Sequence, residues 1–208
     1  MRNLLYVASL SGGKDSVAML LLIHKKKMPL DKIVFMDTGV EFDETYKTIE
    51  DVNKWAIKSF GFGVTTIKPK HDFIYYITKY RRKKGPHIGQ PYIFPNPRSR
   101  WCSNNLKIQP FKRFMKAYLK RNNKEAYMTY IGYAVNETRR IKNKKQNEIY
   151  PLVTYNISEK EALEMCYQAG FDFYGLYKKF KRSSCWLCPF QREKDLITLK
   201  KYYPEKLI

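Results

Sequence analysis

A short glycine-rich segment near the start of the chain constrains its fold more than any other feature. Ser11-Gly12-Gly13-Lys14-Asp15-Ser16 lies between the apolar run Leu4–Ala8 and the helix-like apolar run Val17–Ile23. A strand, a glycine turn and a helix in this order direct unpaired N–H groups and the positive end of the helix dipole toward one point. Lys14 adds a cation, Ser11 and Ser16 add hydroxyl donors, and Asp15 adds an oxygen ligand for Mg²⁺. The segment therefore predicts a phosphate-binding loop.

The rest of the chain alternates strand-like and helix-like segments. This order predicts an α/β fold: a doubly wound, mostly parallel five-stranded sheet with helices on both faces. We expect strands over 3–9, 32–36, 64–67, 128–133 and 149–153. We expect helices over 16–26, 45–60, 71–80, 106–121 and 159–169, the last with Ser158 as N-cap and Glu161 completing a capping box. Residues 1–157 are predicted to form the phosphate-loop domain, and residues 158–208 a small helical, cysteine-containing segment packed on it.

The chain is strongly basic. Its 40 Lys and Arg against 19 Asp and Glu give a net charge of +21, which favours a polyanionic partner such as nucleic acid. Basic residues interleaved with aromatic ones gather at 80–84, 98–101, 139–145 and 178–182. A second interpretation is that abundant lysine reflects an AT-rich genome and solubilises the surface without marking a site.

No apolar run reaches the ~20 residues that span a bilayer, and the first apolar run leads directly into the phosphate loop. We therefore expect a cytoplasmic protein without membrane partners, whose four cysteines are thiols or metal ligands.

A second polar segment follows the second predicted strand. Asp37-Thr38-Gly39-Val40-Glu41-Phe42 comes directly after Met36. Ligands of doubly wound sheets bind beyond the carboxyl ends of the strands, so we expect this segment beside the phosphate loop. Met36 is then placed to touch a base, and the carboxylates to orient a substrate or Mg²⁺.

Together these segments resemble one enzyme superfamily. The first loop has neither the spacing of a Walker loop nor that of a dinucleotide fingerprint; it resembles the pyrophosphate loop of the N-type ATP pyrophosphatases (PP-loop, adenine nucleotide alpha hydrolase-like). The Asp37–Phe42 segment resembles the second signature of the phosphoadenosine phosphosulfate (PAPS) reductase-like family within that superfamily. The stretch 100–110 is similar to that family's RWCxxxLKxxP element, and 132–140 to its substrate loop, although Ala134 stands where an arginine is expected and Thr138 replaces a serine.

The resemblance implies a set of site residues. Lys14, Asp15 and Asp37 would be catalytic. Nucleotide and phosphate would be bound by Ser9, Ser11, Gly12, Gly13, Lys14, Asp15, Ser16, Met36, Asp37, Thr38, Gly39 and Gly132. Substrate would be bound by Glu41, Arg100, Lys107, Glu137, Arg139 and Arg140.

Three cysteines form a candidate metal site. Cys185 and Cys188 make a CxxC pair. Such a pair is a set of metal ligands, a redox dithiol or a coincidence of spacing. The resemblance adds Cys102 as a third sulfur, so the set fits a [4Fe–4S] cluster with one open position, and less well zinc completed by His87 or water. Cys166, on a predicted helix, is expected to be a small core residue.

The expected chemistry is ATP-dependent activation. ATP–Mg²⁺ would adenylate a substrate oxygen, and a sulfur nucleophile, from the cluster or from a cysteine desulfurase persulfide, would displace AMP. The acceptor would be nucleic acid, as in tRNA thiolation or DNA phosphorothioation. The first alternative is PAPS or adenylylsulfate reduction, against which we count the absence of a cysteine after Cys188 in this sequence. The second is a non-catalytic module that binds nucleotide or nucleic acid.

Overall fold

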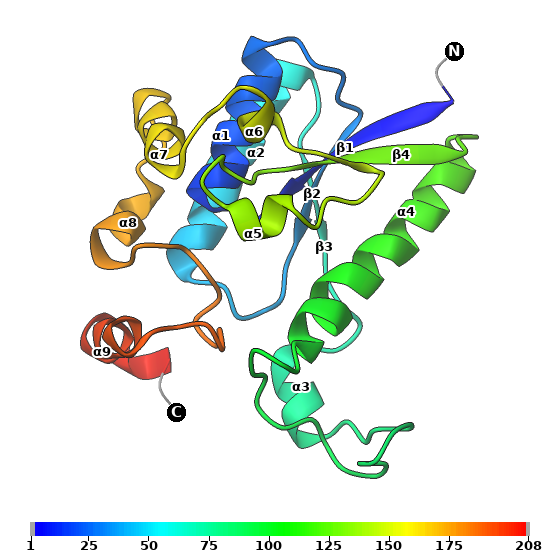
Figure 1. Ribbon diagram of the computed structural model, residues 1–208, viewed down its shortest axis with the longest axis vertical. Helices are drawn as coiled ribbons and strands as arrows, with labels where there is room; N and C mark the ends of the chain where they lie inside the picture. The colour runs from blue at the N-terminus through cyan, green and yellow to red at the C-terminus, as the bar shows by residue number, and fades with distance from the viewer. Residues whose placement is uncertain (1–2, 207–208) are drawn as a thin grey trace. The chain divides into compact units, whose positions relative to one another are not determined.

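The computed structural model describes residues 3–206, which are built around a five-stranded sheet (Figure 1). The strands are β1 Leu4–Leu10, β2 Lys32–Met36, β3 Val64–Ile67, β4 Ala126–Ile131 and β5 Glu148–Ile149, in the order β3-β2-β1-β4-β5. β1 is parallel to β2, with Leu10 opposite Phe35, and parallel to β4, with Ser9 opposite Ile131. β4 is parallel to β5. The predicted α/β fold with a parallel sheet is confirmed.

The strand order explains why helices occur on both faces. The chain moves outward from β1 through β2 to β3 and then returns across β1 to β4. Because crossovers between parallel strands are right-handed, reversing the direction of travel places the returning helix on the opposite face. The outward crossovers use α1 Lys14–Lys25 and α2 Asp43–Phe60, and the return uses α4 Gln109–Arg121. The order reverses between β1 and β4, where ligands of such sheets bind.

Shorter helices complete the structure. They are α3 Phe73–Thr78, α5 Thr138–Ile141, α6 Pro151–Thr154, α7 Glu159–Gln168, α8 Leu176–Lys179 and α9 Glu193–Tyr202, with a π-helix over Ser103–Ile108 and 3₁₀ turns over Phe173–Gly175 and Pro204–Lys206. The predicted capping box of α7 is present: the Ser158 side chain accepts from the Glu161 amide, and the Glu161 carboxylate accepts from the Ser158 amide.

The fifth strand was predicted over 149–153, and this prediction is wrong beyond Ile149. β5 has two residues, and Pro151 begins the helix α6. Proline has no N–H for a sheet ladder, whereas its fixed φ suits the first turn of a helix. The apolar Leu152 is therefore buried from a helix rather than from a strand.

The chain divides into two compact units. Among the described residues, unit 1 comprises 3–35, 43–66 and 115–183, and unit 2 comprises 36–42, 67–114 and 184–206. In unit 1, α1 packs against α6 and α7. The buried side of α1 includes Val17, Leu20 and Ile23, each at most 1% exposed. In unit 2, Val40, Phe73, Trp101 and Leu106 form a core.

The predicted segment 158–208 is shared between these units, with α7 and α8 in unit 1 and α9 in unit 2. Among residues 3–206, no helix is both long enough and apolar enough to cross a membrane.

Candidate active site

The phosphate loop of unit 1 is organised by its own serines and glycines. Ser16 Oγ donates to the Gly13 carbonyl at 2.8 Å and accepts from the Ser11 amide at 3.1 Å and from Ser11 Oγ at 3.0 Å. Gly12 has a φ of +77°, and a Cβ there would lie 2.7 Å from Thr45 Cγ2. Both the backbone angle and the close approach therefore require glycine. Gly13 is the N-cap of α1 and makes no side-chain cap, which leaves the first amides of the helix for other acceptors.

Two hydroxyl groups from the distant segment 177–183 lie on this loop. The Lys14 amide donates to Tyr177 Oη at 2.7 Å, and Tyr177 Oη lies 2.9 Å from Ser183 Oγ. A Cβ on Gly13 would approach Ser183 Oγ to 2.5 Å. The Lys14 amide thus donates to the oxygen of a tyrosine hydroxyl. A phosphate oxygen is an acceptor of the same kind and could take the place of this hydroxyl.

Lys14 is held by two carboxylates. Its Nζ lies 2.8 and 2.9 Å from the two Asp15 carboxylate oxygens and 3.0 Å from Glu159 Oε2, and its side chain is 6% exposed. Burial lowers the pKa of Lys14, but the charges and hydrogen bonds of Asp15 and Glu159 outweigh burial and raise it above its ordinary value. Lys14 is therefore a fully charged, buried cation.

The two carboxylates respond differently. Burial raises the pKa of Asp15 above its ordinary value, opposed by Lys14 and reinforced by Glu137 and Glu159. Burial also tends to raise the pKa of Glu159, but the hydrogen bond and charge of Lys14 lower it overall. Glu159 is therefore the carboxylate that Lys14 keeps ionised most firmly.

Gly132 allows the end of β4 to approach the phosphate loop. A Cβ at this position would lie 2.5 Å from the Asp15 carbonyl oxygen and 2.8 Å from Ser16 Cα. These neighbours are backbone atoms that cannot turn aside. Gly132 therefore belongs to the loop's structural support, at the point where the strand order reverses.

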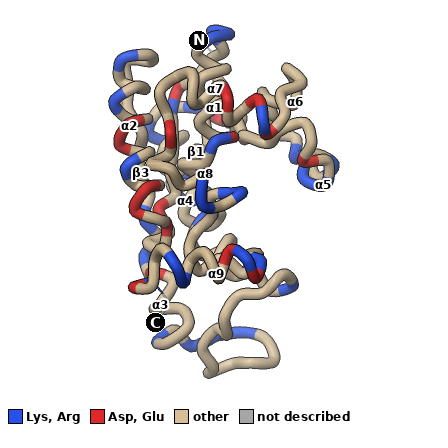
Figure 2. The backbone as a smooth tube through the Cα atoms, turned by 90° about the vertical axis from the view of Figure 1, so that its left-hand side faces the viewer, with Lys and Arg blue, Asp and Glu red and all other residues tan. Residues whose placement is uncertain are grey.

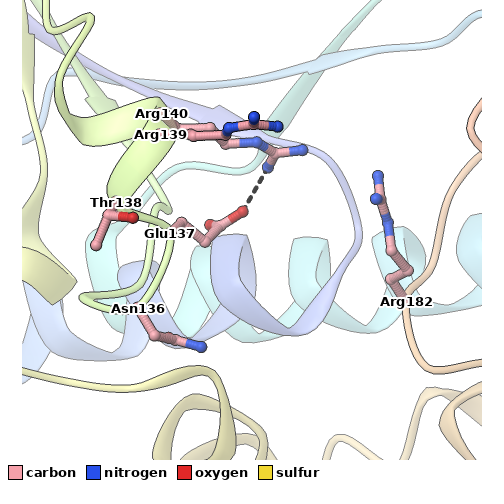
Figure 3. A pocket seen from close by; sticks show the side chains of 6 residues that line it. All are labelled: Asn136, Glu137, Thr138, Arg139, Arg140 and Arg182. Atoms are coloured by element: carbon pink, nitrogen blue, oxygen red, sulfur yellow. Dashed lines mark hydrogen bonds and ion pairs between the residues drawn. The ribbon is translucent and has the colours of Figure 1, made fainter.

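A pocket of unit 1 is lined by three arginines. Its lining comprises Asn136, Glu137, Thr138, Arg139, Arg140 and Arg182. Figure 3 shows Arg182 across the pocket from Arg139 and Arg140. Arg140 Nη1 pairs with Glu137 Oε1 at 2.7 Å, whereas Arg139 and Arg182 form no ion pair with a carboxylate of residues 3–206. Guanidinium groups without a carboxylate suit phosphate or sulfonate oxygens.

Asn136 connects this pocket to the loop lysine. Its Nδ2 donates to Glu159 Oε1 at 3.2 Å, and its Oδ1 accepts from the Glu159 amide at 3.1 Å. Because Glu159 also holds Lys14, the pocket and the phosphate loop share one hydrogen-bond network. In unit 1, the structure brings Lys14, Asp15 and Glu159 into this network, and Glu137 acts on Asp15 through its charge.

The second predicted segment lies in unit 2 and is locally ordered. Asp37 accepts from the Gly39 amide at 2.9 Å and pairs with the exposed Lys68 at 3.7 Å. The Thr38 hydroxyl donates to Glu41 Oε1 at 2.9 Å. Met36, Asp37, Thr38 and Glu41 are all buried, with Met36 ending β2.

Lys107 in unit 2 interacts electrostatically with Glu41 and with two of the cysteines, Cys185 and Cys102. Lys107 Nζ lies 3.5 Å from Glu41 Oε1. Burial lowers the pKa of Lys107, but Glu41 and the nearby Cys185 and Cys102 thiols raise it overall. The Trp186 amide donates to the Val40 carbonyl at 3.0 Å, which ties the CxxC turn to the Glu41 segment.

Two of the three thiols, those of Cys102 and Cys185, have a raised pKa. Burial raises the pKa of Cys102, and Cys188 adds to the shift. A hydrogen bond with Cys188, followed by burial, raises the pKa of Cys185. Both shifts favour the protonated form of these two thiols.

The donor set of three mutually interacting thiols has the chemistry of an iron–sulfur or zinc site. As the side chains stand, however, no group of three or more His, Cys, Asp or Glu within residues 3–206 has an arrangement that could hold a metal ion. His87 is exposed, and Arg100 is exposed with its guanidinium 5.9 Å from the Phe190 ring. Cys166 is fully buried in α7, as predicted for a core residue.

The comparison with protein families decides the relationship. The family model described as the phosphoadenosine phosphosulfate reductase domain matches residues 5–191. The chain belongs to this family. This PAPS reductase family has the PP-loop nucleotide-binding fold that the Ser11–Ser16 loop indicated.

Solved structures show the same fold. The PAPS reductase of Candida auris, in a phosphate complex, superposes with a TM-score of 0.52 at 16% identity, covering 90% of this chain and 83% of that one. The U34-tRNA thiolase NcsA of Methanococcus maripaludis, with its [4Fe–4S] cluster, superposes with a TM-score of 0.51 at 16% identity, covering 99% of this chain and 69% of that one.

Relatives by sequence are longer proteins. Methanocaldococcus jannaschii MJ0066 is 26% identical, covering 96% of this chain and 39% of its own length. MJ0973 of the same organism is 28% identical, and the match covers 98% of this chain and 46% of MJ0973. The nin region protein ORF290 of Escherichia phage lambda is 28% identical, and the match covers 66% of this chain and 51% of ORF290. The chain thus spans about half or less of the curated relatives it matches.

Sequence reasoning missed several members of the unit 1 site. The missed residues lie 122 to 169 positions after Lys14: Asn136, Glu159, Tyr177, Arg182 and Ser183. Two of them carried a signal: Asn136 as part of the segment 132–140, and Arg182 as part of the basic cluster 178–182.

Proposed function

We propose that the chain is an ATP pyrophosphatase that adenylates a nucleic-acid substrate for sulfur transfer. The observation that carries the proposal is the phosphate loop with the buried, charged Lys14 at the start of α1. Loop amides, a helix N-terminus and a lysine are the groups that hold a polyphosphate.

In this proposal, the loop binds the β- and γ-phosphates of ATP. The phosphates exchange places with Tyr177 Oη at the Lys14 amide and with the carboxylates at Lys14 Nζ. Lys14 then neutralises the charge that develops on the leaving pyrophosphate. Arg139 and Arg182, which have no carboxylate partner among residues 3–206, supply cations for the remaining phosphate or for the substrate.

The reaction proceeds in two displacements. A carbonyl-type oxygen of the acceptor attacks the α-phosphorus, and the bond from that phosphorus to the bridging oxygen breaks to release pyrophosphate. A hydrosulfide then adds to the acceptor carbon, and AMP leaves with the original oxygen. The net change replaces oxygen by sulfur without oxidation or reduction. Mg²⁺ would neutralise the phosphates, with Asp15 and Asp37 as the oxygen ligands expected from the sequence.

The cysteine cluster supports the sulfur-transfer part of the proposal. Cys102, Cys185 and Cys188 would hold a [4Fe–4S] cluster, which supplies an iron with an open position for a sulfur ligand. Lys107 adds a positive charge beside these thiols and would offset the negative charge of thiolate ligands. Side-chain movement is required, because the present arrangement does not fit a metal.

The cluster is tested by iron and acid-labile sulfide analysis after anaerobic purification. Bound iron and sulfide, lost in Cys102→Ser and retained in Cys166→Ser, are expected. Iron-free wild-type protein after cluster reconstitution would remove this part of the proposal.

The function is tested by incubating anaerobic protein with ATP, sulfide and bulk tRNA or DNA. Thiolated product, detected by retardation in a mercury-containing gel, should require ATP and disappear in Lys14→Ala. Lys25→Ala, an exposed lysine at the other end of α1, is the matched control and should retain activity. ATP-independent thiolation, or equal thiolation by the Lys14 variant, would contradict the proposal.

Sulfonucleotide reduction is the second candidate, because the family model is described by that activity. Sulfite release from PAPS or adenylylsulfate with reduced thioredoxin, without ATP cleavage in the assay above, would favour it.

A further inference from the structure

A long basic segment of unit 2, apart from Arg100 at its end, has no role in the proposed adenylation chemistry. Residues 79–100, which we call the basic loop, contain no helix or strand and extend beyond α3 (Figures 1 and 2). The basic loop carries seven Lys and Arg and no Asp or Glu. They are Lys79, Arg81, Arg82, Lys83, Lys84, Arg98 and Arg100.

The charge of this region does not follow from composition alone. Between residues 73 and 124 there are fourteen Lys and Arg and no acidic residue. An even spread of the nineteen acidic residues over the chain would place about five there. A codon bias that enriches lysine everywhere would not exclude acids from one stretch, so the segregation indicates a polyanion-binding region.

The basic loop has a defined base. The Arg82 amide donates to the Gln90 carbonyl at 3.0 Å, and the Gly89 amide donates to the Arg82 carbonyl at 2.9 Å, which closes an exposed tip over 83–88. Below the tip, the Tyr92 ring stacks on Tyr80 at 5.5 Å and on Trp101 at 5.0 Å. The chain on either side of the tip therefore meets in a cluster of stacked aromatic rings.

Apolar side chains accompany the charges on the surface. Ile88, Ile93 and Phe94 are 66%, 64% and 51% exposed. Arg82 lies with its guanidinium 5.5 Å from the Tyr92 ring, and its buried Nε has no hydrogen-bond partner within residues 3–206. An exposed ring, here Phe94, on a segment rich in cations is the pattern of surfaces on which unpaired bases stack.

We propose that the basic loop binds an unpaired segment of RNA, with its cations on the phosphates and Phe94 stacked on a base. This inference rests on the proposed function, which requires a nucleic-acid acceptor. It adds that the acceptor is RNA and that it docks on the basic loop. Duplex nucleic acid keeps its base faces stacked inside, so it would use the charges but not Phe94. Unpaired bases occur chiefly in the loops and ends of folded RNA.

The charges are tested by removing four exposed ones from the basic loop, in Arg81→Gln/Lys83→Gln/Lys84→Gln/Arg98→Gln. A control with the same charge, Lys25→Gln/Lys54→Gln/Lys58→Gln/Lys120→Gln, removes exposed lysines elsewhere. The probe is a labelled unpaired 20-nucleotide RNA, and the readout is fluorescence anisotropy. We expect tenfold or greater weakening for the loop variant and twofold at most for the control.

The salt dependence gives an independent readout. Each phosphate contact with a single strand contributes about 0.7 to the magnitude of the slope of log affinity against log salt concentration. Removing four cations should therefore reduce the magnitude of this slope by roughly 2 to 3 in the loop variant. Equal affinity and slope for the loop and control variants would overturn the proposal.

Stacking is tested at Phe94. Phe94→Leu keeps an apolar side chain but removes the ring face, whereas Phe94→Tyr keeps the face. We expect about tenfold weaker binding for leucine and near wild-type binding for tyrosine. Equal binding by both variants would overturn the stacking role. A matched RNA hairpin without unpaired bases, or single-stranded DNA of the same sequence, bound as tightly as the unpaired RNA would overturn the assignment to unpaired RNA.

Failure of the basic loop and failure of the active-site proposal are separable. Pyrophosphate binding, measured by calorimetry in the same variants, depends on Lys14 in unit 1 and should be unchanged by the loop substitutions. RNA binding that persists in a protein unable to cleave ATP would leave the loop assignment intact and remove the catalytic one. If no RNA binds at all, an acidic protein surface becomes the partner indicated, and the RNA proposal is wrong.

Discussion

Gly132 supports the conformation of the phosphate loop because it has no side chain, and not through any charge. In Gly132→Ala, the new methyl group would lie 2.5 Å from the Asp15 carbonyl oxygen, so the loop or β4 must shift. We expect a loss of about 1–3 kcal/mol in the free energy of unfolding, the usual cost of overpacking, together with loss of pyrophosphate binding. Urea denaturation and calorimetry measure the two effects.

The control for this substitution is Gly61→Ala. Gly61 has a φ of +79°, and a methyl group added there would have nothing within 4 Å. This variant should lose stability through backbone strain alone and bind pyrophosphate normally. Wild-type pyrophosphate affinity in Gly132→Ala would contradict the structural role assigned to that glycine.

Glu159 competes with phosphate for Lys14. Because its carboxylate lies 3.0 Å from Lys14 Nζ, an incoming phosphate must displace or share that partner. In Glu159→Gln one negative charge leaves the site, and we expect pyrophosphate to bind about three- to tenfold more tightly. Calorimetry at low salt measures the change.

Glu164→Gln, on the same helix and exposed, is the matched control and should bind as wild type. Weaker pyrophosphate binding by Glu159→Gln would show that Glu159 positions Lys14 rather than competing with phosphate.

At the scale of elements, α7 and the phosphate loop are joined through Cys166. Its thiol donates to the Lys14 carbonyl at 3.3 Å, and burial raises the pKa of this thiol to about 12 from an ordinary value near 9. Between these values the unfolded chain loses the thiol proton and the folded chain keeps it, so folding weakens as pH rises. Below pH 9 both states are protonated and no such loss occurs.

We therefore expect the stability advantage of wild type over Cys166→Ala to shrink between pH 9 and 10.5. The limit is about 1.4 kcal/mol per pH unit. Urea denaturation at several pH values measures the gap, and a gap independent of pH would contradict the buried, protonated thiol.

The elements also show what the sequence could and could not predict. The phosphate loop, the capping box at Ser158 and the alternating strands and helices were predictable because each depends on neighbouring residues. The prediction of the fifth strand was wrong from Pro151 onward, where helix α6 begins. A short apolar run such as this one is compatible with either a helix or a strand. The placement of Tyr177 and Glu159 on the loop was not predictable, because only tertiary folding joins residues so distant in sequence.

At the scale of the whole molecule, the two units carry different chemistry. Unit 1 holds the phosphate loop, the lysine network and the arginine pocket. Unit 2 holds Cys102, Cys185, Cys188, Lys107 and the basic loop. Under the two proposals, unit 1 supplies the nucleotide site, and unit 2 supplies the sulfur site and the surface for the acceptor.

The identity of the products formed from α-labelled ATP tests the central claim most directly. We predict AMP with one equivalent of pyrophosphate in the presence of RNA, and neither product from Lys14→Ala. ADP with orthophosphate, or AMP formation unaffected by loss of Lys14, would contradict it.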